Sequence, residues 1–321
     1  MATSDELGVE KTVELSAGTI RYRERGSGPA VVFVHGLLVN GDLWRNVVPA
    51  VSREYRCLAP DWPLGSHSVP VRAGADLSPP GVASLIGEFL EALDLSDVTL
   101  VANDTGGALT QILMTTGPER IGRVVLTSCD AFKRFFPPPF SVLPRLLRVP
   151  GQTWLMSRVM QVKRLRPLLF GSVARRPVPP EIADSYLRPC RDAGIRRDLR
   201  AFVVAVHRRH TLAAASALPG FTKPVLLAWA REERLFPGIG ARLAAVLPNA
   251  RLVEVADSYT FVPEDQPAVL AGLITEFIAS SQGGPADPAH PAGPLPGDPG
   301  GPDDGGPRAV RGARLRGGLG G

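Results

Sequence analysis

Six short apolar runs, spaced so that helices fit between most of them, limit this chain to few folds. The runs occupy residues 30–36, 55–59, 98–102, 123–129, 224–230 and 251–256. Apolar runs of this length predict strands that are buried on both faces. Apolar positions three and four apart predict helices at residues 42–51, 77–95, 108–116, 238–247 and 266–280. Alternating strands and helices predict an α/β fold with a doubly wound, mostly parallel sheet, preceded by a hairpin at residues 12–23.

The alternation stops after the fourth run, and this break predicts how the chain is organised. Residues 131–220 are proline-rich, with helical patterns and no clear buried strand, so we expect a helical cap inserted into a core of residues 1–130 and 221–280. The final segment, residues 281–321, has 13 Gly and 8 Pro among 41 residues. Such a composition buries too little apolar surface to fold, so we expect a disordered tail.

The net charge of +5 is unevenly distributed. Residues 131–215 contain 17 Lys/Arg and 4 Asp/Glu, which gives +13 there and −8 elsewhere. A basic block can indicate nucleic acid or an anionic membrane as a partner. This block lacks the interleaved aromatic residues of a single-strand platform and any nucleic-acid motif, so we interpret it as a solvated basic face and expect no nucleic-acid partner.

The N-terminal segment, the lengths of the apolar runs and the cysteines predict where the protein is located in the cell. The N-terminal segment is acidic and has no apolar stretch, unlike a secretory signal. No run approaches the roughly 20 apolar residues of a membrane span. Three widely spaced cysteines, Cys57, Cys129 and Cys190, form neither a metal motif nor a disulfide framework. We therefore expect a cytoplasmic protein without a membrane span and without a metal site.

The segment "VANDTGG", residues 101–107, joins the third apolar run to a helical pattern through a glycine-rich turn. A strand, a sharp turn and a helix form a nucleophile elbow, which here places Asp104 at the exposed apex. The backbone N–H of Thr105, together with that of Leu37 after His35-Gly36, is expected to form an oxyanion hole. Gly106 leaves room for close packing behind the apex.

These motifs resemble the α/β-hydrolase superfamily over about residues 15–280. The resemblance is carried by "FVHG", "LWRNVVP", "APDWPLG", "ANDTGGALTQ", "PERIGRVVLT", "LLAWAREERLFP" and "VPEDQP". An aspartate at the apex is similar to the haloalkane dehalogenase and epoxide hydrolase branch. The resemblance implies that the Asp104 carboxylate attacks carbon and forms an ester, which a histidine-activated water then hydrolyses. A carboxylate suits this role because it is ionised near pH 7.

The chain departs from that branch at the base. Glu233, with Glu232 as its neighbour, stands where the branch has its acid, but Thr260 stands where the branch has its histidine. A threonine hydroxyl does not titrate near neutral pH. His67 is the best of the remaining candidates for a base, while His35 is expected to shape the site.

Other features of the two named activities are missing too. Dehalogenases of this branch carry a tryptophan after the nucleophile, where this chain has Thr105, and epoxide hydrolases use paired cap tyrosines, where this cap has only Tyr186. His207 and His210 indicate a basic surface helix. Asp257 and Tyr259, beside Thr260, could also hydrogen-bond in the site.

Two hypotheses of function remain open. The first is a cofactor-independent hydrolase of a small, largely apolar substrate, with Asp104, Glu233 and His67 as catalytic residues. The second is a catalytically silent homologue that binds a ligand or partner through the same pocket, as the missing histidine suggests. A basic-surface adaptor is a third and weaker reading. The oligomeric state is not predicted.

Overall fold

The structure is a computed structural model that describes residues 4–282. Residues 1–3 and 283–321 lie outside the described part, so nearly all of the predicted disordered tail does too. The described residues contain an eight-stranded sheet with the order β1-β2-β4-β3-β5-β6-β7-β8. The first two strands pair antiparallel, and β2 pairs antiparallel with β4, whereas β3 to β8 are parallel. The predicted doubly wound, mostly parallel sheet is therefore confirmed.

The strands lie close to the predicted apolar runs because those runs are buried on both faces. Their bounds are β1 Val9–Leu15, β2 Gly18–Arg25, β3 Ala30–Val34, β4 Arg56–Pro60, β5 Val98–Asp104, β6 Ile121–Cys129, β7 Val225–Ala230 and β8 Ala250–Val255. All residues of β7 are buried, as expected of a central parallel strand. The edge strand β8 is largely exposed or half-buried instead, and only its last residue, Val255, is buried.

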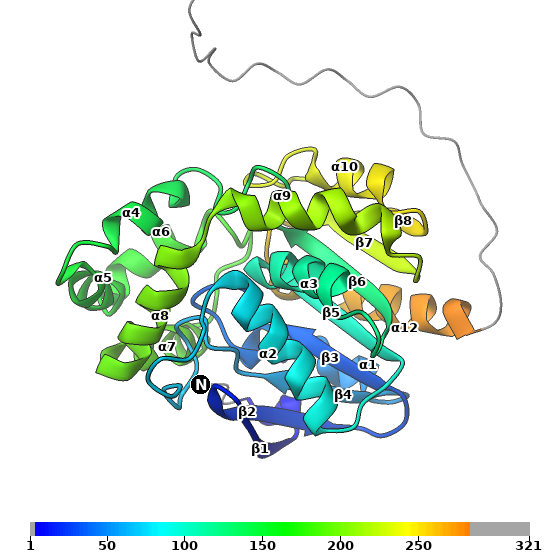
Figure 1. Ribbon diagram of the computed structural model, residues 1–321, viewed down its shortest axis with the longest axis horizontal. Coiled ribbons are helices and arrows are strands. Elements are labelled where there is room, and N and C mark those ends of the chain that lie inside the picture. Colours follow the sequence, from blue (N-terminus) through cyan, green and yellow to red (C-terminus); the bar gives the residue numbers. More distant parts are fainter. Residues whose placement is uncertain (1–3, 283–321) are drawn as a thin grey trace, which may run out of the picture. The chain divides into compact units, whose positions relative to one another are not determined.

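Helices cover both faces of the sheet (Figure 1). On one face α2 packs beside α3, and α1 packs beside α12 on the other. Their bounds are α1 Val48–Val51, α2 Pro79–Ala92, α3 Thr105–Thr116, α10 Ile239–Val246, α11 Val262–Asp265 and α12 Pro267–Gln282. The helix predicted at residues 42–51 is instead a 3-10 turn, Gly41–Trp44, followed by the short α1, with Pro49 in its first turn.

The predicted helical insertion is present between β6 and β7. It contains α4 Leu143–Leu146, α5 Gln152–Met160, α6 Arg166–Phe170, α7 Pro180–Leu187, α8 Ala193–Ala205 and α9 Arg208–Ala217. Helix α9 packs against α3 of the core, whereas α4, α5 and α6 lie together away from β7 and β8 (Figure 1).

Two buried carboxylates join the insertion to the core. Asp265 accepts hydrogen bonds from the backbone N–H groups of Arg175 and Arg176, at 3.0 and 2.8 Å. Glu264 accepts hydrogen bonds from both terminal nitrogens of Arg45, at 2.6 and 2.7 Å, and from the hydroxyl of Tyr186 at 3.0 Å. The paired charges and the hydroxyl satisfy one another, as buried polar groups must.

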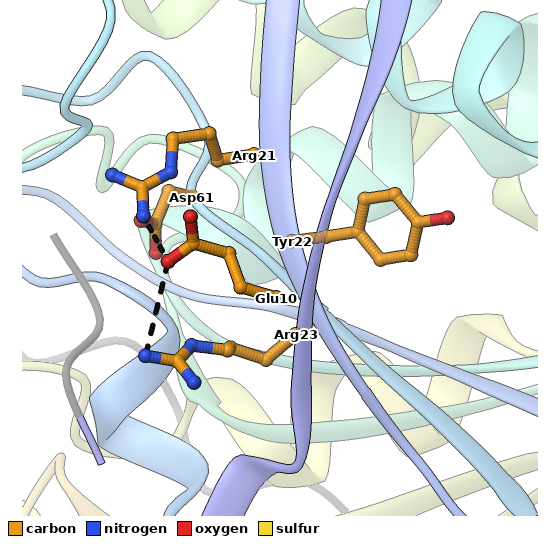
Figure 2. Close-up of a pocket in the computed structure, with 5 residues that line it drawn as sticks. All are labelled: Glu10, Arg21, Tyr22, Arg23 and Asp61. Carbon is orange, nitrogen blue, oxygen red and sulfur yellow. Dashed lines mark ion pairs between the residues drawn. The ribbon is translucent and has the colours of Figure 1, made fainter. Parts of the chain in front are cut away.

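Strand β2 shows how alternation sorts side chains between the two faces of the sheet. Arg21 and Arg23 point to one side and both form ion pairs with Glu10, whereas Tyr22 between them points to the other (Figure 2). The Tyr22 ring packs edge-on against Phe89 of α2, with 5.3 Å between centroids. The arginine side is thus a surface ion-pair cluster, and the tyrosine side belongs to the core.

Within residues 4–282, no helix combines the length and the apolar character that crossing a bilayer requires.

Candidate active site

Asp104 ends β5 and precedes α3 in a strained backbone conformation, with φ 54° and ψ −132°. Non-glycine residues adopt positive φ rarely, and mostly where the surroundings enforce it. Two glycines make the turn possible. A Cβ on Gly36 would lie 2.2 Å from Asp104 Oδ2, and a Cβ on Gly106 would lie 2.4 Å from the carbonyl oxygen of Val34. Asp104 therefore has the geometry of a nucleophile elbow.

Two backbone donors hold the Asp104 carboxylate. The N–H of Leu37 donates to Asp104 Oδ2 at 3.3 Å, and the N–H of Thr105 also donates to this carboxylate. The structure thus brings together the three groups that the sequence motifs placed at the two strand ends. The pKa of Asp104 is nevertheless raised to about 6: burial is the main cause, the charge of Glu233 adds to it, and the two N–H donors act in the opposite direction.

A second buried carboxyl group, Asp130, lies beside the elbow. It directly follows β6 and accepts a hydrogen bond from Thr105 Oγ1 at 3.1 Å. Burial, and then the charge of Asp104, hold the pKa of Asp130 well above its usual range. The two neighbouring carboxyl groups thus oppose each other's ionisation, and the charge of Asp104 favours the protonated form of Asp130. We did not identify Asp130 from the sequence, although its position at the carboxyl end of a parallel strand was a usable signal.

Glu233 and Thr260 are in direct contact. Thr260 Oγ1 donates to Glu233 Oε1 at 2.9 Å, and the same oxygen accepts the N–H of Leu235 at 2.8 Å. Glu233 Oε2 is buried and has no hydrogen-bond partner in the described structure. Thr260 is fully buried, and its carbonyl oxygen accepts a hydrogen bond from Nδ2 of Asn103, the residue before Asp104, at 2.7 Å. Thr260, which stands where the sequence resemblance implied a histidine, thus holds one oxygen of Glu233 and carries no titrating nitrogen.

A cavity of about 420 Å³ lies over Asp104, between the core and the insertion. Of its lining side chains, Asp104, Thr105 and Gln152 are polar, and the others are apolar, among them Phe136, Phe140, Met156, Met160, Leu169 and Phe170. A carboxylate at one wall of an otherwise apolar cavity suits a small apolar molecule with a single reactive or polar group.

The histidines lie elsewhere. Among the described residues, none that lines the cavity is a histidine. His67 Nε2 bonds Asp198 Oδ2 of α8 at 3.2 Å, and both side chains are buried. Burial alone would raise the pKa of Asp198, but hydrogen bonds from His67, from the Val71 N–H and from Arg197 lower it. His67 therefore connects the loop after β4 to the insertion.

His35 shapes the loop that carries Leu37. Its Nε2 accepts the N–H of Trp62 at 2.8 Å, and its Nδ1 lies 2.9 Å from the carbonyl oxygen of Gly36. Burial lowers the pKa of His35 to about 3, so its ring is neutral near pH 7. His207 accepts the N–H of Arg209 at the start of α9, and His210 is partly exposed on the same helix.

The remaining predicted neighbours of the site do not line the cavity. Tyr186 is fully buried and bonds Glu264. Asp257 forms an exposed ion pair with Arg175 at 3.2 Å, and Arg234 stacks on the ring of Tyr259. None of these side chains reaches the cavity over Asp104.

Known proteins share this architecture. The family model described as "Alpha/beta hydrolase family" matches residues 31–273. The chain is 29% identical to haloalkane dehalogenase 2 of Mycobacterium bovis, over 81% of this chain and 92% of the relative. It is also 29% identical to the uncharacterised hydrolase YugF of Bacillus subtilis, over 80% and 93% of the two chains.

Solved structures agree on the fold. The epoxide hydrolase CorEH superposes with a TM-score of 0.72 at 22% identity, covering 85% of this chain and 99% of that structure. The match to more than half of the chain, the sheet order and the elbow together establish that this chain belongs to the alpha/beta hydrolase family.

Proposed function

We propose that the protein is a cofactor-independent hydrolase in which Asp104 attacks a small, largely apolar electrophile. The observation that carries the proposal is the Asp104 carboxylate on the wall of the apolar cavity, held by the N–H groups of Leu37 and Thr105. One carboxylate oxygen forms a bond to a substrate carbon, and the leaving group departs with the electron pair of the broken bond. The product of this step is an ester of Asp104.

In the second step, water attacks the carbonyl carbon of that ester. Negative charge then develops on the ester oxygen, where the Leu37 and Thr105 N–H groups can stabilise it. Glu233 is the group that we propose takes the proton of the water, because its Oε2 is buried without a partner while Thr260 and Leu235 hold its Oε1. The tetrahedral intermediate collapses, and the departing alkoxide takes the proton from Glu233 and leaves as the alcohol. The Asp104 carboxyl group then releases the second proton of the water to solvent, which restores the carboxylate.

Thr260 supports the second candidate, a silent homologue that binds a ligand. A carboxylate is a weaker base than an imidazole, so a threonine in place of a histidine would slow hydrolysis of the ester more than any other step. In that case the protein forms the ester, or only binds the molecule, and releases no product.

Intact-mass spectrometry with parallel product analysis separates these candidates. Wild type, Asp104→Asn and Glu233→Gln are incubated with small alkyl halides, epoxides and activated esters. We expect product from wild type, neither adduct nor product from Asp104→Asn, and a persistent adduct from Glu233→Gln. Glu232→Gln is the matched control. Neither glutamate lines the cavity, but Glu233 contacts Thr260 and its charge acts on Asp104, whereas Glu232 accepts the N–H of Ser258. An adduct that persists on wild type would favour the silent candidate, and turnover by Asp104→Asn would refute the nucleophile.

A further inference from the structure

The insertion exposes its apolar side chains, which is unusual for the outer surface of a protein. Eight of the thirteen exposed large apolar residues of the described structure fall within residues 142–168. We call these eight residues the cap patch: Val142, Leu146, Val149, Trp154, Leu155, Val159, Val162 and Leu168. Clustered exposed apolar residues mark surfaces that contact another apolar phase, whereas single ones need no explanation.

Helix α5 has the reverse of the usual burial pattern. Of its three buried residues, Thr153 and Ser157 are small and polar and only Met160 is apolar, whereas Trp154, Leu155 and Val159 are exposed by 54%, 49% and 42%. Residues three and four apart share a helix face, so Leu155 and Val159 lie on one face of α5, and the exposed Val162 follows just after the helix ends. A helix in contact with water would place these residues inward. Its outer face is therefore suited to an apolar environment.

Positive charge is interleaved with the cap patch. Residues 131–176 contain ten Lys/Arg and no Asp/Glu. Within the described chain, ion pairs link only Arg166 and Arg175 of these ten to carboxylates, namely to Asp184 and Asp257. Five exposed basic residues are interspersed with the patch along the chain: Arg145, Arg148, Arg158, Lys163 and Arg164.

This combination fits one kind of partner. An apolar face flanked by Lys/Arg is the signature of segments that lie in the interface of a membrane, with the apolar side chains among the acyl chains and the cations at the headgroups. Tryptophan is favoured at that depth because its ring is amphipathic. A protein partner would need a matching acidic and apolar surface, whereas an anionic bilayer supplies both properties at once.

The cap patch is also continuous with the cavity. Leu146, Leu155 and Val159 belong to the cap patch and also line the cavity over Asp104. The cavity thus opens at the patch. An apolar molecule dissolved in a bilayer could pass from there to the cavity without crossing water, whatever chemistry Asp104 performs.

We propose that the cap patch docks the protein on anionic lipid bilayers. The four tryptophans provide a direct test, because Trp154 is 54% exposed while Trp44, Trp62 and Trp229 are buried. Vesicles of phosphatidylglycerol and phosphatidylcholine should shift the fluorescence of the full chain to shorter wavelength and protect it from acrylamide. Vesicles of phosphatidylcholine alone should not. In Trp154→Phe the spectral change should disappear while the protein still floats with the anionic vesicles.

Vesicle flotation of surface variants tests the position of the contact. Val162→Asp should lose flotation, whereas Val269→Asp should keep it, because Val269 in α12 lies outside the cap patch. The two substitutions are matched, because both replace a valine of almost the same exposure, 46% and 47%. Replacing Lys163 and Arg164 together by glutamine should lower the partition coefficient roughly 25-fold, about fivefold for each charge.

Three results would overturn the proposal. They are an unchanged spectrum with anionic vesicles, equal flotation of Val162→Asp and Val269→Asp, and sedimentation of a dimer that Val162→Asp dissociates. The last result would assign the cap patch to an interface between two copies of the chain. None of these measurements depends on turnover, so the docking can fail while the proposed hydrolase stands, and the reverse.

Discussion

If Asp104 is the nucleophile that we propose, its pKa should make the rate of ester formation strongly dependent on pH between 5 and 7. Only the ionised carboxylate attacks carbon, and burial raises the pKa of this group to about 6. About 90% of Asp104 is then ionised at pH 7 and about 10% at pH 5. The initial rate of adduct formation should therefore rise roughly tenfold over this interval. An aspartate with an ordinary pKa would give an almost flat profile, because it is already ionised at pH 5.

Glu233→Gln tests the electrostatic origin of that profile. The charge of Glu233 contributes to the raised pKa of Asp104, so removing the charge must lower that pKa. The midpoint of the rate profile should move to lower pH, and the rate at pH 7 should change little. Initial rates from intact mass, measured at saturating electrophile in wild type and the variant, give both midpoints. A flat wild-type profile, or a midpoint that moves upward in Glu233→Gln, would refute the reasoning.

Three further predictions concern stability and the elbow. The folded-state pKa of Asp104 exceeds the usual value of 3.8, so ionisation of Asp104 destabilises the fold. Asp104→Asn should therefore raise the free energy of unfolding, measured by urea titration, by about 1–3 kcal/mol at pH 8 and leave it unchanged below pH 4. Gly36→Ala would place a Cβ 2.2 Å from Asp104 Oδ2 and should abolish adduct formation at a cost of about 1–3 kcal/mol, which mass spectrometry and thermal unfolding would detect. Glu264→Gln leaves Arg45 as an uncompensated buried charge and should cost about 3–5 kcal/mol, whereas Glu276→Gln, in an exposed ion pair, should cost less than about 1 kcal/mol in the same unfolding assay.

The strands and the elbow were predictable from sequence because both depend on local patterns. Apolar runs predict buried strands, and the glycines after Asp104 predict a tight turn before a helix. Helix α3 begins at Thr105, three residues before the predicted start, because Gly106 and Gly107 weaken the helical signal although close packing requires them.

The contacts of the side chains around the site were not predictable in the same way. His67 follows a strand end, which made it a candidate base, but its partner Asp198 is 131 residues further along the chain. No local pattern announces such a pairing. The exposed face of α5 escaped prediction for a related reason: its apolar residues have the spacing of a core-facing helix, but the structure leaves Trp154, Leu155 and Val159 exposed.

The ion pair between Arg45 and Glu264 has a consequence for how the chain reaches its fold. The two residues are 219 positions apart, and both are buried. Contacts of such long sequence separation close late, because the entropy of the intervening loop must be lost first. During synthesis the guanidinium of Arg45 would therefore lack its partner Glu264 until almost the whole described chain has left the ribosome. We expect the nascent chain to stay open at this point, and to complete its core only after α11 arrives.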